Sequence, residues 1–327
     1  MNELIRKLVE TYGPSGFEDR IRQTLRAEVE SLADEVQVTP LGSLVAVRRG
    51  SGGGRRIMLA AHMDEIGVMI THVDEKGFLR FATIGGVSPM TCLGARVEFE
   101  SNVVGVIGIE KWEDRSKAPD FRKLYIDVGA TGRADCPVRV GDAAVFCRPF
   151  VAQGRRLIAK AMDDRIGCAV LVETLRRLDD TPHEVHFVFS VQEETTLSGA
   201  WTAAYSIEPA LAIAVDVTTT GDTPECEPMA VELGQGPAVK VQDGGMVAHP
   251  LVRDLLVRAA EKAGVAHQME VLQGGTTDAA VMQLARAGVP SGCLSIPCRY
   301  VHTPSEMVDE QDVEGAVQVI VQATKMA

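Results

Sequence analysis

No apolar run of about 18 residues occurs in the 327-residue sequence, so it contains no candidate for a bilayer-spanning helix. The first 13 residues alternate charged and apolar side chains at helical spacing. They lack the apolar core and small-residue cleavage site of a secretory signal. We therefore expect a cytoplasmic protein that does not act in a membrane.

Paired cysteines and basic clusters are also missing. The seven cysteines are an odd number, and none forms a CxxC pair with zinc or redox spacing, so we expect reduced thiols. No Lys/Arg-rich run is visible and the net charge is −12, which argues against a nucleic-acid partner because phosphate contacts need a basic face. One possible source of the acidic excess is a set of carboxylates that holds cations.

Helix-like and strand-like segments alternate over most of the chain, which is typical of an α/β fold. The apolar run RIMLAA, residues 56–61, predicts a strand that is buried on both faces, as in a parallel sheet. Periodicity predicts further helices at 164–178, 250–263, 277–287 and 310–324, and further strands at 185–191, 211–216 and 289–296.

The pattern changes between residues 67 and 156. Short β-like runs punctuated by glycines, without a long helical period, predict a small all-β unit there. Because the strand and helix alternation continues on both sides, the unit looks inserted into an α/β domain. We therefore divide the chain into a first α/β part, 1–66, an inserted β-rich domain, 67–156, and a second α/β part, 157–327.

Metal-ligand side chains occur where the predicted strands end, and open α/β sheets place their sites at such ends. The set is His62 and Asp64 after RIMLAA, Asp163 and Asp164 at a helix start, Glu193 and Glu194 after HFVFSVQ, Asp216 after LAIAV, and His302 after SIPCRY. Each alone has an ordinary structural explanation, such as a helix N-terminal acid. Together they favour a metal site.

Imidazole and carboxylate ligands without cysteine suit Zn²⁺, Co²⁺ or Mn²⁺ in a hydrolytic site. The balance of charge between these carboxylates and divalent cations favours a pair of ions, with one carboxylate left over to act as a base.

Several segments resemble one known family in order and spacing. They are GPSGFE, AHMDEIG, LYIDVGA with RVGD, KAMDDRIG, VQEE, AVD, GDTP, GGTTDA and SIPCRYVHTPSEMV. The family is that of the tetrahedral aminopeptidases, metallopeptidase family forty-two, whose members are also called glutamyl aminopeptidases and sometimes cellulases or endoglucanases. The resemblance implies a zinc-exopeptidase-like three-layer α/β catalytic domain, interrupted by a β-rich domain that mediates subunit contacts.

The resemblance also implies which side chains would bind the two metal ions. His62 and Asp216 would hold one ion, and Glu194 and His302 the other. Asp163 would bridge the two ions.

Catalytic roles follow for two more residues. Glu193 would be the general base of an aminopeptidase that removes the N-terminal residue of peptides, and Asp64 would orient the His62 imidazole. The chain departs from the family at 195–198, where TTLS replaces a Val-Gly-Leu-Arg stretch, so the loop beside the base is expected to differ. In GGTTDA, helix capping and substrate contact both stay open.

Three alternatives and one assembly prediction accompany this reading. A related two-metal deacylase or dipeptidase would use the same fold. A glycosidase would need two carboxyls flanking the sugar bond, roughly 5 to 9.5 Å apart. A catalytically silent scaffold would assemble through the β-rich unit. The expected partners are peptide substrates and further copies of the chain, from a dimer up to the twelve-subunit shell that the resemblance suggests.

Overall fold

The computed structural model describes residues 1–112 and 114–327, which form a mixed α/β fold. Its α-helices are α1 (Asn2–Glu10), α2 (Asp19–Val29), α3 (Pro89–Cys92), α4 (Met162–Arg177), α5 (Glu193–Thr196), α6 (Ser198–Ile207), α7 (Pro250–Ala263), α8 (Ala279–Met282) and α9 (Glu310–Met326). None of the described helices is both long and apolar enough to cross a membrane.

The strands fall into two groups. A large sheet contains β1 (Glu35–Val38), β2 (Leu44–Arg48), β3 (Arg56–His62), β10 (Val151–Gln153), β11 (Arg156–Ala159), β12 (Glu184–Ser190), β13 (Leu211–Thr218), β14 (Ala238–Gln242), β15 (Gln268–Val271), β16 (Ser291–Arg299) and β17 (Glu306–Asp309). A closed barrel contains β4 (Gly67–Val73), β5 (Leu79–Ile84), β6 (Arg96–Phe99), β7 (Val104–Ile109), β8 (Leu124–Asp127) and β9 (Ala143–Phe146).

Four neighbouring strands in the order β12-β3-β13-β16 form the parallel centre of the large sheet. Apart from their end residues, these strands are buried on both faces, which explains their continuous apolar sequences. Because they are parallel, their carboxyl ends meet at one edge of the sheet, and the side chains that follow them converge there.

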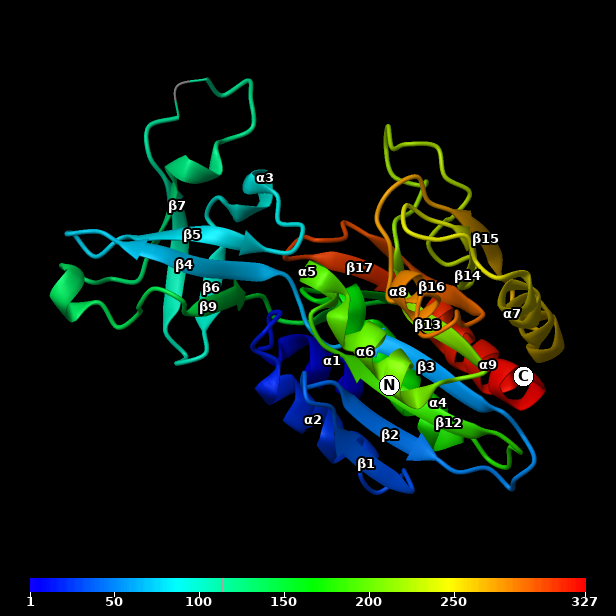
Figure 1. The fold of residues 1–327 in the computed structure, drawn as a ribbon. Coiled ribbons are helices and arrows are strands. Elements are labelled where there is room, and N and C mark those ends of the chain that lie inside the picture. The colour runs from blue at the N-terminus through cyan, green and yellow to red at the C-terminus, as the bar shows by residue number, and fades with distance from the viewer. Residues whose placement is uncertain (113) are drawn as a thin grey trace.

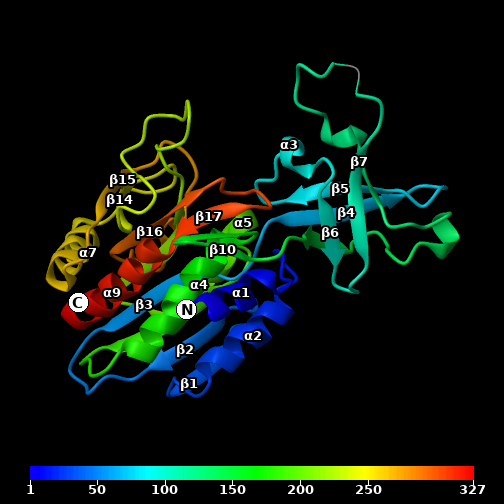
Figure 2. The same ribbon diagram turned by 180° about the vertical axis from the view of Figure 1, so that it is seen from behind.

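Helices cover both faces of this sheet (Figures 1 and 2). Along β3, Ile57, Leu59 and Ala61 pack in one hydrophobic core with α1, α2, α4, α7 and α9. The alternate residues Met58 and Ala60 pack in a second core with α6 and α8. The two-residue period of the strand thus distributes one apolar sequence between two cores.

The barrel has its own hydrophobic core and stands beside the α/β body in both views (Figures 1 and 2). Its strands close in the order β4-β5-β8-β7-β6-β9, and every pair is antiparallel. The β-rich segment expected at 67–156 contains all six barrel strands. It also contains β10, which pairs with β11 in the large sheet.

Most of the predicted elements are confirmed, including α7, which begins at Pro250 and ends at Ala263. The helix expected at 277–287 is wrong in length, because only Ala279–Met282 form α8. The backbone enters the left-handed region at Arg286 (φ 55°) and Gly288 (φ 107°), so the chain turns back toward β16 instead of continuing as a helix.

Candidate metal centre

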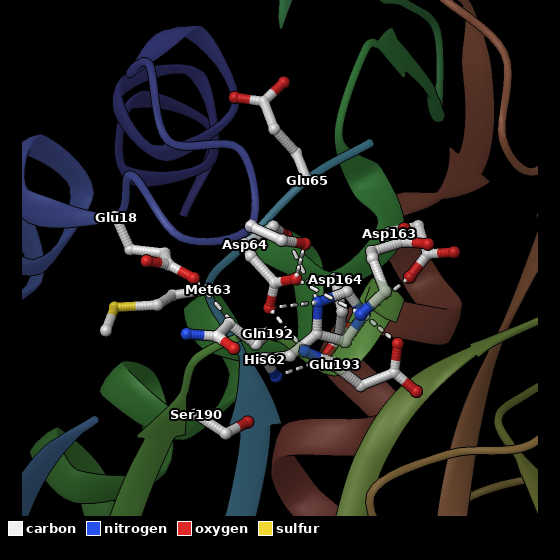
Figure 3. Close-up of polar contacts among 12 residues, drawn as sticks. Glu18, His62, Met63, Asp64, Glu65, Asp163, Asp164, Ser190, Gln192 and Glu193 are labelled. Atoms are coloured by element: carbon white, nitrogen blue, oxygen red, sulfur yellow. Dashed lines mark hydrogen bonds and ion pairs between the residues drawn. The ribbon is translucent and has the colours of Figure 1, made fainter. Parts of the chain in front are cut away.

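The predicted site residues lie at the carboxyl edge of the parallel strands. Figure 3 shows five of them close together: His62, Asp64, Asp163, Asp164 and Glu193. His62 is the last residue of β3, and Asp216 lies near the end of β13. Asp163 lies in the first turn of α4, Glu193 and Glu194 begin α5 just after β12, and His302 lies between β16 and β17. Five separate chain segments therefore supply one cluster of side chains.

Asp163 lies between the two imidazoles. Its Oδ1 is 2.9 Å from Nε2 of His62, and its Oδ2 is 3.1 Å from Nε2 of His302. The same Nε2 of His302 is 3.2 Å from Oε2 of Glu194. One carboxylate thus reaches both histidines through different oxygens, which is the arrangement that a bridging ligand requires.

The tautomer of His62 is set by its other ring nitrogen. Nδ1 lies 3.1 Å from the backbone oxygen of Asp64, and a carbonyl oxygen can only accept, so Nδ1 carries the proton. With no ion bound, Nε2 also carries a proton and donates it to Oδ1 of Asp163. Against the lowering effect of burial, this hydrogen bond helps to raise the pKa of His62. Loss of the Nε2 proton would free the Nε2 lone pair for a cation. The Asp64 carboxylate is farther away, with Oδ1 at 3.5 Å from Nδ1.

Asp64 has a second set of contacts that the sequence did not indicate. Its Oδ1 and Oδ2 accept hydrogen bonds from the backbone N–H groups of Glu193 and Glu194 at 3.0 and 3.2 Å. Oδ2 also accepts a hydrogen bond from Oγ of Ser15 at 2.5 Å. Asp64 therefore holds the start of α5 as well as the loop beside His62.

The two glutamates are in a helix and not at a strand end, because Gln192 adopts a left-handed conformation (φ 58°) that ends the extended chain. Glu193 Oε2 lies 3.8 Å from Nε2 of His62, and Glu194 faces His302. The glycines of the loop after β5 pack against this helix and His302: a Cβ on Gly86 would lie 2.4 Å from Nδ1 of His302. A barrel loop therefore borders the site.

Asp164 belonged to the set of possible metal ligands in the sequence but was given no role of its own, and its contacts agree with the alternative of a helix-start residue. Oδ1 accepts from the backbone N–H of Gly167 at 3.0 Å, and Oδ2 accepts from the backbone N–H of His62 at 3.2 Å. Asp164 also has an oxygen within 4.8 Å of ligand atoms of His62 and Asp216. It thus connects α4 to β3 next to His62 and Asp216.

Glu306 was missed, and Asp278 was considered only within GGTTDA, as a helix cap or a substrate contact. Oε1 of the fully buried Glu306 accepts from the backbone N–H of His302 at 2.7 Å, and Oε2 accepts from that of Asp163 at 3.0 Å. Asp278 does not cap α8 with its side chain; it accepts from Oγ of Ser190, while Thr277 Oγ1 accepts from the backbone N–H of Ala279. The contact of Glu306 with Asp163 spans 143 positions, so no local pattern could have shown it.

Buried charge dominates the electrostatics of the cluster. Burial raises the pKa of Glu193 and of Asp216 well above the usual carboxyl range. Burial would also raise the pKa of Asp163, but hydrogen bonds from His302 and His62 hold it below its usual value. For His302, burial lowers the pKa, but hydrogen bonds to Asp163 and Glu194 outweigh it and raise the pKa to about 11.

The residues present fit divalent metal ions. Two groups of His and carboxylate ligand atoms each lie within 4.8 Å of one another: His62 with Asp164 and Asp216, and His62 with Asp163 and Glu194. Oε1 of Glu194 is buried and has no hydrogen-bond partner. Buried carboxylates that outnumber the neighbouring cations, with an unsatisfied oxygen among them, favour a site that binds cations.

A cavity of about 520 Å³ opens on the cluster. Asp163, Glu193, Glu194, Asp216 and His302 line one side of it. The remaining lining comes mainly from the end of β13, from Lys240 in the middle of β14 and from the loop between β15 and α8. A substrate in this cavity would contact the cluster from its solvent side.

An α/β body with His and carboxylate side chains clustered at its strand ends is an arrangement that metal-dependent hydrolases use. The model of the M42 glutamyl aminopeptidase family matches residues 42–319, and this chain belongs to that family. It is therefore a peptidase of the aminopeptidase type, a hydrolase that acts on peptide bonds.

Individual proteins are similar over almost the full length. A relative from Acetivibrio thermocellus is 47% identical over 99% of this chain and 98% of its own. The solved structure of the aminopeptidase APDkam598 from Desulfurococcus kamchatkensis has a TM-score of 0.96 and 40% identity, covering 99% of this chain and 94% of its own. The Pyrococcus horikoshii TET1 peptidase, which can assemble into a tetrahedron or a large octahedral shell, has a TM-score of 0.88 and 31% identity, with 98% of each chain covered.

Proposed function

We propose that this aminopeptidase uses two divalent metal ions, zinc, cobalt or manganese, to remove the N-terminal residue of peptides. The observation that carries the proposal is the Asp163 carboxylate, whose two oxygens face the imidazoles of His62 and His302. In this account the catalytic unit is a zinc-exopeptidase-like three-layer α/β domain, and the β-rich segment 67–156 is inserted into it for assembly.

Five side chains would hold the ions. His62 and Asp216 would bind one, Glu194 and His302 the other, and Asp163 both. When bound, such ions polarise the scissile carbonyl and make a water molecule acidic enough to attack at neutral pH. The remaining requirements fall on the protein, which must hold the ligands and move protons.

Glu193 is the proposed general base. It is the first residue of α5 and lines the cavity. Its Oε2 lies 3.8 Å from Nε2 of His62, which is close to the cluster but too far for a hydrogen bond to that imidazole. Its carboxylate would accept a proton from the attacking water and later deliver it to the nitrogen of the leaving amine as the C–N bond breaks. Asp64 would keep Glu193 in place through the backbone N–H of that residue.

A matched pair of peptides tests the proposal. One peptide has a free amino end and the other has the same sequence with an acetylated amino end. We expect stepwise release of residues from the free peptide only, abolished by chelation and restored by added zinc, cobalt or manganese. Comparable cleavage of the acetylated peptide would indicate a deacylase or an endopeptidase, and activity that persists in the chelated, metal-free protein would exclude the metal mechanism.

A further inference from the structure

A buried lysine side chain lines the cavity beside the cluster. Lys240 lies on β14, and it is the only Lys or Arg among the described residues that line this cavity. The rest of the lining outside the cluster is apolar or hydroxylated, with side chains from Leu197, Leu272 and Val301 and from several threonines. If Lys240 were free, it would be the natural partner of an acidic substrate side chain.

The Lys240 ammonium is instead engaged within the protein. Its Nζ contacts Oε1 of Glu270, the residue directly opposite on the parallel strand β15. Oε1 of Glu270 also accepts a hydrogen bond from Oγ1 of Thr218 at 2.8 Å. A second carboxylate oxygen, Oδ2 of Asp243, lies 3.6 Å from Nζ. All three ionisable side chains are almost completely buried.

The group formed by Lys240, Glu270 and Asp243 contains two carboxylates and only one ammonium. Burial would lower the pKa of Lys240, but the adjacent Glu270 outweighs burial and raises it, so the ammonium stays charged. Two carboxylates then face one ammonium, and neither Oε2 of Glu270 nor Oδ2 of Asp243, the oxygen that faces Lys240, has a hydrogen-bond partner. An acidic group that entered the cavity would find the ammonium of Lys240 already paired with two carboxylates, and no other Lys or Arg in the described lining.

We infer that this cavity selects peptides whose first residue has an uncharged, largely apolar side chain and discriminates against acidic first residues. The inference rests on the proposed aminopeptidase function. It assigns the specificity to Glu270 and Asp243, which pair with the ammonium of Lys240 and leave it unavailable to a substrate. A basic side chain gains little, because Lys240 lines the cavity whereas Glu270 and Asp243 are not among its lining residues. Leu197, Leu272 and Val301 would supply the apolar contacts.

The first test is a panel of leucyl, methionyl, glutamyl, aspartyl and lysyl amides hydrolysed by the metal-loaded protein. We expect kcat/KM for the leucyl and methionyl amides to exceed that for the glutamyl and aspartyl amides by about 10²-fold or more. A glutamyl amide that is cleaved within tenfold of the leucyl amide would overturn the inference. No hydrolysis of any free-amine amide would instead count against the proposed function itself.

The second test releases Lys240. Glu270→Gln keeps the shape of the side chain and removes one negative charge, so we expect the ratio of glutamyl to leucyl kcat/KM to rise about tenfold. Asp243→Asn should shift the ratio in the same direction, and it is the alternative if Glu270→Gln does not fold. The matched control is Asp312→Asn, which neutralises another buried carboxylate whose partners, the backbone N–H groups of Gly234 and Gly236, lie outside the cavity lining. An unchanged ratio in a folded Glu270→Gln or Asp243→Asn protein, or an equal rise in the control, would refute the role of this group.

Discussion

Glu193 and Glu194 are neighbours in sequence but have different surroundings. Glu194 faces His302 at 3.2 Å, whereas Glu193 lies 3.8 Å from His62. Oε1 of Glu194 has no hydrogen-bond partner, as expected for an atom that binds a cation. The two residues should therefore respond differently to the same substitution.

Glu194→Gln removes a negative charge from the proposed ligand set, so metal affinity should fall and excess metal should partly restore activity. Glu193→Gln leaves the five ligands intact and should retain metal, but kcat should drop by about 10² to 10⁴ because the amide cannot accept a proton. Elemental analysis and kcat at saturating substrate measure both effects. If Glu193→Gln loses metal and Glu194→Gln keeps it, the two roles are exchanged.

For single residues, the sequence could predict a role in the site for side chains that follow strands. It could not do so for side chains whose hydrogen-bond partners are backbone groups far away in the chain. His62, Glu193 and Asp216 were recognisable because each stands at the end of an apolar run. Glu306 accepts from the backbone N–H of Asp163, 143 positions away, and no local pattern carries that information. Buried carboxylates of this kind become visible only when the strands are assembled.

Buried carboxylates position the helices and strands of the site by accepting hydrogen bonds from backbone N–H groups. Asp64 holds the start of α5, and Asp164 connects β3 with α4. Glu306 connects the start of α4 with the loop that carries His302, whose backbone is left-handed (φ 61°). The local conformations that bring the ligands together thus depend on a few buried acceptors.

Glu306→Gln should loosen two ligands at once, because an amide offers only one oxygen to two N–H donors. We expect metal affinity to fall roughly 10- to 100-fold, the range seen when groups that orient ligands are replaced, together with about 1 to 3 kcal/mol of stability. Metal titration and thermal unfolding of the metal-free protein measure the two effects separately.

Asp312→Asn is the matched control for this prediction. Asp312 also accepts two hydrogen bonds from backbone N–H groups, those of Gly234 and Gly236, both at 2.7 Å. Its side chain is as fully buried as that of Glu306. We expect a similar loss of stability without a change in metal affinity. If both variants lower metal affinity by the same factor, Glu306 has no specific role in positioning the ligands.

For the whole molecule, the sequence predicted a β-rich unit from residue 67 because the period of the apolar residues changes there, and all six barrel strands lie within the predicted range 67–156. The end of the unit was harder to place, since β10 is a short strand with the same character as the barrel strands but pairs in the large sheet. Strand pairing is not local information, so composition alone cannot assign such a strand. The cytoplasmic location stays a prediction.

Assembly into at least a dimer is expected through the barrel. Val104 and Val106 alternate along β7 and are 49% and 46% exposed, so they form an apolar outer face on that strand. Light scattering at micromolar concentration should give a mass well above 35.1 kDa, and Val104→Asp with Val106→Asp should lower it. A fully active wild-type monomer would contradict an assembly that is needed for function.

The number of divalent ions bound per chain tests the central claim most directly. Native mass spectrometry or elemental analysis of metal-loaded protein, after removal of loosely bound ions, should give two ions per chain. Asp163→Asn, which alters the carboxylate between His62 and His302, should lower that number. A fully active wild-type protein with one ion per chain, or with none, would contradict the account.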